Sequence, residues 1–540
     1  METQRLRRRR SRKRARKKQI TWLVVLALVI GIGVWGRILV ERRNDASLVD
    51  AVLARSDPEA TVAPGASSAA RPRVPAAAPP ASAARNLVLF VGHGFGMVPM
   101  TATRLYSGGE DGELAIDRLP ETAMVRTGSR NAQTADSAAA MSAYLTGVRV
   151  DNEVLSQTAD THPYDESGRA QSAHGETSCP SIGNGKRAAT LLEMAKASGR
   201  AVGIVTTGRV TQAGISAAYA HLCQRDGENT IATQLVPDGP GTNARLGDGV
   251  DVILGGGWAR FLPKDDPRGS SRNDGRDLFA EMRAKGYAVI GRQGELAAAA
   301  QAAQGTTQPV DKLLGLFARG TMSFEADRLG TSEPSLAEMT GRAIDLLAQK
   351  RTGFLLIVEG HNIGEALDGS LARKALQEGR GFDDAVKVAI DKLRATDPEL
   401  RDTLVVATAD HDHTLVMNGN ASFVERTTET RPGVLGLLRP YDAPAQLAQD
   451  ASGRPYTTLV FGTGEKRVRG PRSQAPALTD LALGARDSRY ESAIEVTAGP
   501  GGTIGGADVL LGAIGANAAR FHGTLDNTQV FALLREALGL

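Results

Sequence analysis

Three short apolar runs place the strongest constraint on the fold of this chain. Each is rich in Val, Leu, Ile or Phe and ends in residues that can bind a metal ion or a phosphate. Such runs predict strands buried on both faces of an α/β sheet. Ligands of open α/β sheets gather beyond the carboxyl ends of the strands, so the three ends are expected to meet. The runs are residues 86–91, which lead to His93; residues 354–358, which lead to Glu359 and His361; and residues 404–407, which lead to Asp410, His411 and His413.

Residues 134–139 place an acidic residue and a hydroxyl at the start of a small-residue helix that is predicted to reach about Tyr144. The first turn of a helix has free backbone N–H groups and the positive end of the dipole, so it favours an anion. Ser137 is therefore a candidate nucleophile toward a phosphate ester. Asp136 and Ser137 are also residue types that commonly cap helices. The hypothesis that Ser137 is a nucleophile therefore depends on whether the three strand ends lie close to it.

Over residues 86–540 the sequence resembles the alkaline phosphatase family. The segments that carry the resemblance are specific through their order and spacing. They are residues 86–96, Thr134-Ala135-Asp136-Ser137-Ala138, Thr206-Thr207, Ala220-His221 with Arg225, residues 251–257, Val358-Glu359-Gly360, Thr408-Ala409-Asp410-His411, and Gly505-Gly506 with Asp508-Val509. The resemblance implies an α/β fold with a doubly wound sheet, flanking helices and peripheral insertions. It also implies a homodimeric phosphate monoester hydrolase with two zinc ions, a magnesium ion and a phosphoserine intermediate.

The resemblance gives several residues a role. Ser137 is similar to the nucleophile, and Arg225 to the arginine that grips the phosphate oxygens. A planar guanidinium suits that task because it donates two parallel hydrogen bonds to a phosphate. Asp410 and His411 look like two ligands of the zinc ion beside the serine. Glu359 looks like a carboxylate ligand of the magnesium ion.

The magnesium site departs from the family pattern. His93 stands where the family has an aspartate that bridges zinc and magnesium. An imidazole binds one metal through one nitrogen, and it suits zinc far better than magnesium. Gln212 and Gly214 stand where the family supplies further magnesium ligands. The bridge is therefore expected to be lost.

The second zinc site is reduced further. Where the family has Asp-x-x-x-His after Glu-Gly, this chain has Gly-Glu-Ala-Leu-Asp at residues 364–368. The third family ligand, a histidine, is replaced by Ile504. Of the three expected ligands only Asp368 could bind a metal. Ligand distances must be right to within a few tenths of an ångström, which makes a rebuilt site demanding. The residues that could rebuild it are His361, Glu365 and His413.

One catalytic metal site remains. His93, Asp410 and His411, with the fourth position open or filled by Ser137, make a set of the kind zinc uses in catalysis. One zinc ion could activate the serine, but the lost ion would have stabilised the leaving oxygen. The sequence therefore predicts a slow phosphate monoester hydrolase with one zinc ion. The alternatives are an enzyme with a rebuilt second site and an inactive protein that binds phosphate, metal or a partner.

The basic character of the chain is confined to its start. Residues 1–18 hold eleven Arg and Lys and one Glu, a net charge of +10. Because the whole chain has a net charge of +4, all later residues together carry a net charge of about −6. No nucleic-acid-binding domain is therefore expected. Residues 19–41 contain a long apolar run and predict one transmembrane anchor in the inner membrane, with the basic tail 1–18 in the cytoplasm.

The anchor would place the rest of the chain outside the membrane. Residues 42–85, rich in Ala, Pro and Ser, predict a disordered linker. Residues 86–540 would then form a periplasmic or extracellular catalytic domain. A cleaved signal peptide is the alternative, although no small-x-small cleavage pattern follows the apolar run promptly.

The remaining sequence patterns predict helices and strands with a structural role. Helical periodicity marks residues 186–198, 335–350 and 382–394, and short apolar runs mark strands at 201–206 and 251–254. Cys179 and Cys223 could pair in an exported domain, or they could remain two core thiols. His522 is expected to be structural.

Overall fold

The computed structural model describes residues 83–540 except 181, 269–271, 302–309, 420–425, 429–430, 469, 475–476 and 497–502. The predicted basic tail, anchor and linker lie outside the described residues, apart from residues 83–85. Among the helices that the structure describes, none combines the length and apolar character needed to cross a bilayer.

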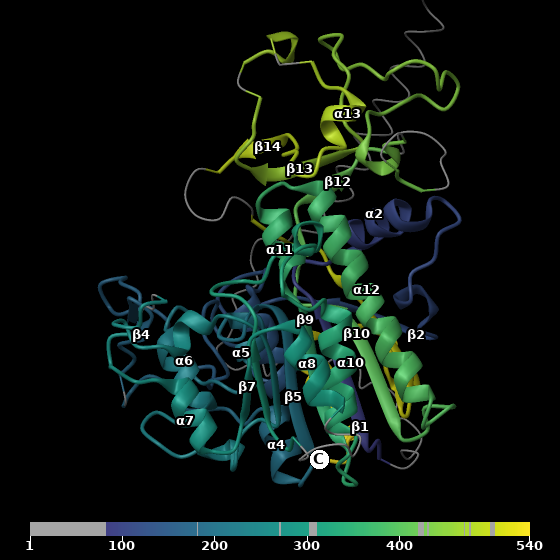
Figure 1. The fold of residues 1–540 in the computed structure, drawn as a ribbon. Helices are drawn as coiled ribbons and strands as arrows, with labels where there is room; N and C mark the ends of the chain where they lie inside the picture. The colour runs from purple at the N-terminus through teal and green to yellow at the C-terminus, as the bar shows by residue number, and fades with distance from the viewer. Residues whose placement is uncertain are drawn as a thin grey trace, which may run out of the picture. The chain divides into compact units, whose positions relative to one another are not determined.

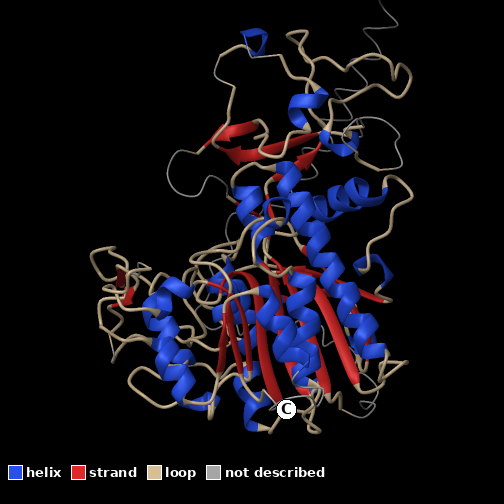
Figure 2. Ribbon diagram, viewed as in Figure 1, coloured by secondary structure: helices blue, strands red, loops and turns tan. Residues whose placement is uncertain are grey.

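A ten-stranded mixed sheet forms the centre of the fold (Figure 2). Every strand in it runs in the same direction except β16, which is antiparallel to both of its neighbours. The predicted α/β class is confirmed, and the sheet is mixed rather than fully parallel. The strands in spatial order are β17 (Gly523–Asp526), β2 (Glu121–Arg126), β16 (Val509–Gly515), β10 (Thr403–Ala409), β1 (Asn86–Gly92), β9 (Phe354–Gly360), β5 (Ala201–Arg209), β6 (Val252–Gly256), β8 (Leu313–Leu316) and β7 (Ala288–Ile290).

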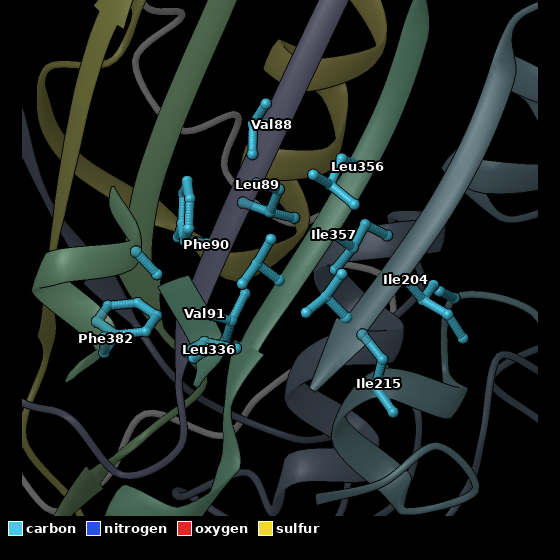
Figure 3. Close-up of a cluster of buried hydrophobic side chains, with 14 of the residues drawn as sticks. Val88, Leu89, Phe90, Val91, Ile204, Ile215, Leu336, Leu356, Ile357 and Phe382 are labelled. Atoms are coloured by element: carbon cyan, nitrogen blue, oxygen red, sulfur yellow. The ribbon is translucent and has the colours of Figure 1, made fainter. Parts of the chain in front are cut away.

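The apolar runs form the middle strands because both of their faces are covered. Val88, Leu89 and Phe90 of β1 are fully buried, as are Leu356 of β9 and Ile204 of β5. Figure 3 shows these side chains packed in one cluster with residues from the flanking helices. Parallel strands need such cover on both faces, and these runs supply the apolar surface for it.

Helices flank the sheet, and α10 and α12 pack against each other beside it (Figure 1). The predicted helices at 186–198 and 335–350 are present but shorter, and the predicted helix at 382–394 begins ten residues earlier. The flanking helices are α2 (Met97–Gly108), α3 (Ser137–Thr146), α4 (Leu191–Ala197), α5 (Ala213–Ser216), α10 (Leu336–Leu347), α11 (His361–Asp368), α12 (Ala372–Arg394) and α14 (Asn527–Ala537).

The early start of α12 reflects its close packing on α2. A Cβ atom at Gly379 would lie 2.6 Å from Thr103 Oγ1 and 2.8 Å from the ring of Phe95. Glycine therefore permits the helices to approach, although glycine disfavours a helix in isolation. The first ten residues of α12, 372–381, contain two glycines and several charged residues, so their sequence alone does not indicate a helix.

Shorter elements fill the insertions between the sheet strands. A separate three-stranded sheet has β13 (Leu459–Gly464) between β12 (Leu415–Met417) and β14 (Ser492–Glu495). These insertions agree with the predicted peripheral elements. The other short elements are β3 (Ser172–Ala173), β4 (Glu176–Thr177), β11 (Asp412–His413), β15 (Ile504–Gly505), α6 (Glu228–Leu235), α7 (Leu278–Ala284), α8 (Gln293–Gln301), α9 (Glu325–Arg328) and α13 (Asp480–Leu483).

Candidate metal centre

The three predicted strand ends meet in the structure. β1 lies between β10 and β9, and Gly92 is in register with Ala409 on one side and Gly360 on the other. The next residues of each strand therefore leave the sheet at one level. This register brings together three segments that are far apart in the sequence.

His93, Asp410 and His411 form a compact group beyond these strand ends. One potential ligand atom from each lies within 4.8 Å of the others. Asp410 and His411 are buried, and His93 is partly buried. Among the residues that the structure describes, it is the one group of three or more His, Cys, Asp or Glu side chains whose potential ligand atoms lie close enough together to hold a metal ion.

The backbone around the group orients each ligand. His93 Nδ1 lies 3.3 Å from the His361 carbonyl oxygen, and His411 Nδ1 lies 2.8 Å from the Asp412 carbonyl oxygen. A carbonyl oxygen accepts a hydrogen bond from a protonated Nδ1, and the Nε2 of a neutral imidazole then keeps its lone pair for a metal ion. Asp410 Oδ1 accepts hydrogen bonds from the backbone N–H groups of Gly94 and His411, at 2.9 and 2.8 Å.

Electrostatics favour the protonation states that bind cations. Burial, opposed by Asp410, lowers the pKa of His93, so its neutral imidazole is favoured. Burial alone would raise the pKa of Asp410, but His411, His93 and the Gly94 N–H group hold it below its usual range. A neutral imidazole and an ionised carboxylate are the forms that serve as zinc ligands.

Ser137 lies at the first position of α3, directly beside the group. Its Oγ is 3.3 Å from His411 Nε2. Asp136 caps the helix by accepting a hydrogen bond of 2.9 Å from the Ala139 N–H group. Tyr144 donates a hydrogen bond of 2.9 Å to the Ala409 carbonyl, which fixes α3 against the end of β10. The serine therefore has both of the proposed attributes, a helix N-terminus and a neighbouring metal-capable group.

Arg225 reaches the same helix start through Asp136. Its Nη1 donates to Asp136 Oδ2 at 2.9 Å, and its backbone N–H group donates to the Glu153 carbonyl at 2.8 Å. The Glu153 N–H group in turn donates to Asp136 Oδ2 at 3.0 Å. Burial alone would lower the pKa of Arg225, but Asp136 raises it, so the guanidinium stays charged. Asp136 thus joins the start of α3 to Arg225.

A disulfide bond lies two residues before this arginine. Cys179 and Cys223 are bonded, with their Cα atoms 5.8 Å apart. Of the two open alternatives, the paired form is therefore the one that the structure shows. The bond ties the segment with the β3–β4 hairpin to the segment that carries Arg225.

Glu359 lies outside the three-residue group and has other partners. Its Oε2 accepts a hydrogen bond of 2.6 Å from Thr206 Oγ1. Its Oε1 is 3.9 Å from His361 Nδ1. No local sequence pattern marks Thr206 as a partner of Glu359, although Thr206 belongs to one of the family-like segments.

His361 contacts two carboxylates and the ring of His93. Its Nε2 lies 3.0 Å from Glu365 Oε1, and its ring stacks on that of His93 with centroids 4.8 Å apart. Burial would lower the pKa of His361, but the nearby carboxylates of Glu359 and Glu365 raise it to about 9. His361 lowers the pKa of Glu365 to about 2.

Asp368 and His413 pair with each other and not with the three-residue group. Asp368 Oδ1 is 3.1 Å from His413 Nε2. In the antiparallel pairing of β11 and β15, His413 stands opposite Ile504. Buried His413 Nδ1 has no hydrogen-bond partner among the described residues. Asp368, the remaining predicted ligand of the second metal position, thus contacts His413, one of the three residues that could rebuild that site.

Gly364 stands where the family has a metal ligand, and its lack of a side chain affects the space around His93. A Cβ atom at this position would lie 2.3 Å from His93 Nδ1. The missing side chain therefore provides the space for the imidazole. A glycine at a position where the family has a ligand is the sequence signal for this arrangement.

Comparisons with known proteins agree with this geometry. A model of the alkaline phosphatase family matches residues 84–540. The tissue-nonspecific alkaline phosphatase of Gallus gallus is 34% identical over 483 residues, which cover 83% of each chain. The membrane-bound alkaline phosphatase of Bombyx mori is 31% identical over 479 residues, which cover 83% of this chain and 78% of the relative.

Solved structures show the same similarity in three dimensions. The alkaline phosphatase of Thermus thermophilus aligns with a TM-score of 0.58 and 26% sequence identity. The alignment covers 85% of this chain and 92% of the Thermus chain. The match of sequence and fold extends over nearly all the described residues, and this chain belongs to the alkaline phosphatase family.

Proposed function

We propose that this protein is a membrane-tethered phosphate monoester hydrolase that forms a phosphoserine at Ser137 with the help of one zinc ion. Family membership supports phosphomonoester hydrolysis as the activity. The single observation that supports the reduced metal content is the group of His93, Asp410 and His411 beside the serine. A single-pass anchor at residues 19–41 in the inner membrane, a periplasmic or extracellular active site, and a homodimer remain part of the proposal.

The residues present fit a zinc ion. Two imidazoles whose Nδ1 atoms face backbone carbonyls and one carboxylate make a three-ligand set, and Ser137 Oγ, 3.3 Å from His411 Nε2, is a candidate fourth ligand. When bound there, zinc supplies positive charge that stabilises the ionised hydroxyl of Ser137. Asp368 and Glu359 are engaged elsewhere, so neither is assigned to this ion.

The chain's own residues would carry the two chemical steps. Arg225 and the N-terminus of α3 bind the phosphate oxygens. The Ser137 hydroxyl gives its proton to water, and attack by Oγ forms an O–P bond while the bond from phosphorus to the alcohol oxygen breaks. The leaving alkoxide then takes a proton from water. A water oxygen then attacks phosphorus, the Oγ–P bond breaks, Oγ regains a proton, and inorganic phosphate leaves.

The second metal position bears on the rate of both steps. In a two-metal site, one ion stabilises the attacking oxygen and the other the leaving oxygen. Here Asp368 and His413 contact each other and Ile504 supplies no ligand. We therefore expect turnover well below that of a two-zinc enzyme, with a strong preference for esters that have good leaving groups.

An inactive binding protein is the second candidate. It is favoured by the Asp368–His413 pair, because an enzyme would gain from a working second ion. It is opposed by Ser137, Asp136 and Arg225, which keep a connected arrangement that a purely structural descendant does not need.

Metal analysis and an aryl phosphate assay on the wild type and Ser137→Ala test the proposal. We expect about one zinc ion per chain and hydrolysis that is lost in Ser137→Ala. Equal activity in both proteins would overturn the mechanism. A zinc-loaded wild type without activity would favour the binding protein.

A further inference from the structure

We infer that the position which the family resemblance gives to magnesium is filled in this protein by its own side chains, with His361 held between Glu359 and Glu365, so that the centre takes no Mg²⁺. These three residues are called the acid–histidine cluster below. The inference rests on the proposed function and deepens it, because it specifies which divalent ion the site accepts.

The donor atoms do not suit magnesium. Mg²⁺ requires near-octahedral coordination by oxygen, with one or two carboxylates in its protein sites. Glu359 Oε2 already accepts the Thr206 hydroxyl, Gly214 offers no side chain, and the His93 imidazole is a poor magnesium ligand. Gln212 Oε1 accepts the Arg209 N–H group at 2.8 Å, so that oxygen has a partner as well.

Two glycines provide the space that the cluster occupies. A Cβ atom at Gly214 would lie 1.8 Å from Glu359 Oε1, and one at Gly208 would lie 2.7 Å from His361 Cγ. A side chain at either position would collide with the cluster. Glu359 and His361 therefore fill the volume into which a ligand from position 214 would have to point.

His361 connects the cluster to the zinc ligands. Its Nε2 is 3.0 Å from Glu365 Oε1 and its Nδ1 is 3.9 Å from Glu359 Oε1. The ring stacks on His93 at 21°, and the His361 carbonyl lies 3.3 Å from His93 Nδ1. Since both the ring and the carbonyl contact His93, His361 is a positioning residue for this ligand.

The test measures metal binding and not only activity. Full-length protein in detergent is stripped of metal and titrated calorimetrically with ZnCl₂ and with MgCl₂, and its Tm is recorded with each salt. We expect zinc to bind and raise the Tm, and millimolar Mg²⁺ to give neither binding heat nor a Tm shift. Stoichiometric Mg²⁺ binding that Glu359→Gln abolishes would overturn the inference.

A variant provides the positive test. His361→Ala leaves Glu359 and Glu365 facing an emptied volume, so we expect Mg²⁺ to raise its Tm. We also expect zinc affinity to fall roughly tenfold, because His93 loses its support. His522→Ala, at an exposed histidine, is the matched control and should behave as wild type. Unchanged zinc affinity in a folded His361→Ala protein would refute the positioning role.

The outcome is separable from that of the proposed function. Activity that persists in Ser137→Ala would refute the mechanism without affecting the magnesium titration. Magnesium binding by an otherwise zinc- and Ser137-dependent enzyme would refute only the present inference.

Discussion

His93 can occupy its place only because position 364 has no side chain. The imidazole lies where a Cβ atom of residue 364 would approach to 2.3 Å, a distance that real Cβ contacts do not show. The His93 ring nitrogen and a methyl group on residue 364 would overlap, so they cannot both occupy this volume. One methyl group at position 364 should therefore affect metal binding.

Gly364→Ala is expected to lower zinc affinity by roughly tenfold or more, because it displaces His93 from the other ligands. Calorimetric zinc titration of the metal-free protein measures the change. Gly381→Ala, in α12, is the matched control. A Cβ atom at Gly381 would have no atom from outside its own helix within 4 Å. Equal zinc affinity in Gly364→Ala and wild type would show that His93 is not a ligand.

Glu378 gives a second prediction at the scale of one residue. Burial raises the pKa of this carboxyl to about 8, and it accepts a hydrogen bond from the Glu325 N–H group. Because its pKa in the unfolded chain is lower, the free energy of unfolding falls as pH rises from about 4.5 to 8. The group is neutral in both states below that window, so the loss is absent there.

Glu378→Gln removes this ionisation and keeps the acceptor oxygen. We expect the loss of stability between pH 5 and pH 8 to shrink by about 2–4 kcal/mol relative to wild type. Denaturant unfolding at both pH values measures it. Glu399→Gln, at an exposed carboxyl, should leave the loss unchanged. The same pH dependence in Glu378→Gln and wild type would contradict the assignment.

At the scale of elements, the Cys179–Cys223 bond joins the segment with the β3–β4 hairpin to the segment that carries Arg225. The arginine is held on one side by this bond and on the other by Asp136. The bond is thus expected to restrict the positions open to the guanidinium. A disulfide also fits the oxidising side of the membrane to which the anchor would direct the domain.

Replacing both cysteines by serine tests this restriction. We expect the free energy of unfolding to fall by about 2–4 kcal/mol, and the inhibition constant for inorganic phosphate to rise several-fold at unchanged zinc content. The zinc measurement separates a shifted arginine from a damaged metal centre. An unchanged inhibition constant would assign the bond to stability alone.

The elements also show what the sequence could predict. β1, β9 and β10 were predictable because both faces of each are buried, so their sequences are continuous apolar runs. The first ten residues of α12 were not, because Gly379 serves packing on α2 rather than helix propensity. The antiparallel direction of β16 is likewise set by its neighbours in space.

In the candidate site, too, some features could be predicted from the sequence and others could not. Family-like motifs indicated Ser137, Arg225, Asp410 and His411, whose positions in the chain are marked by local patterns. The Thr206–Glu359 and Asp368–His413 contacts were not predictable, because they join residues 153 and 45 positions apart. Such contacts depend on how the elements pack, and no local pattern of the chain encodes them.

At the scale of the whole molecule, the predicted anchor at residues 19–41 would place the reaction outside the inner membrane. Full-length protein is expected in the membrane fraction after washing at high salt and alkaline pH, whereas a chain without residues 19–41 should not be retained there. Protease added outside the inner membrane should reach the domain at 86–540. Mass spectrometry of purified protein that lacks residues 1–41 would support the cleaved signal peptide instead.

The exclusion between residues 93 and 364 also constrains the history of the molecule. The family pattern has aspartate at both positions, and a change from that pair to the present one avoids a collision only if glycine at position 364 comes before histidine at position 93. Restoring a carboxylate at 364 is blocked for as long as the imidazole stays. A return to aspartate at both positions would therefore have to begin at position 93, because replacing His93 first removes the ring that blocks a side chain at position 364.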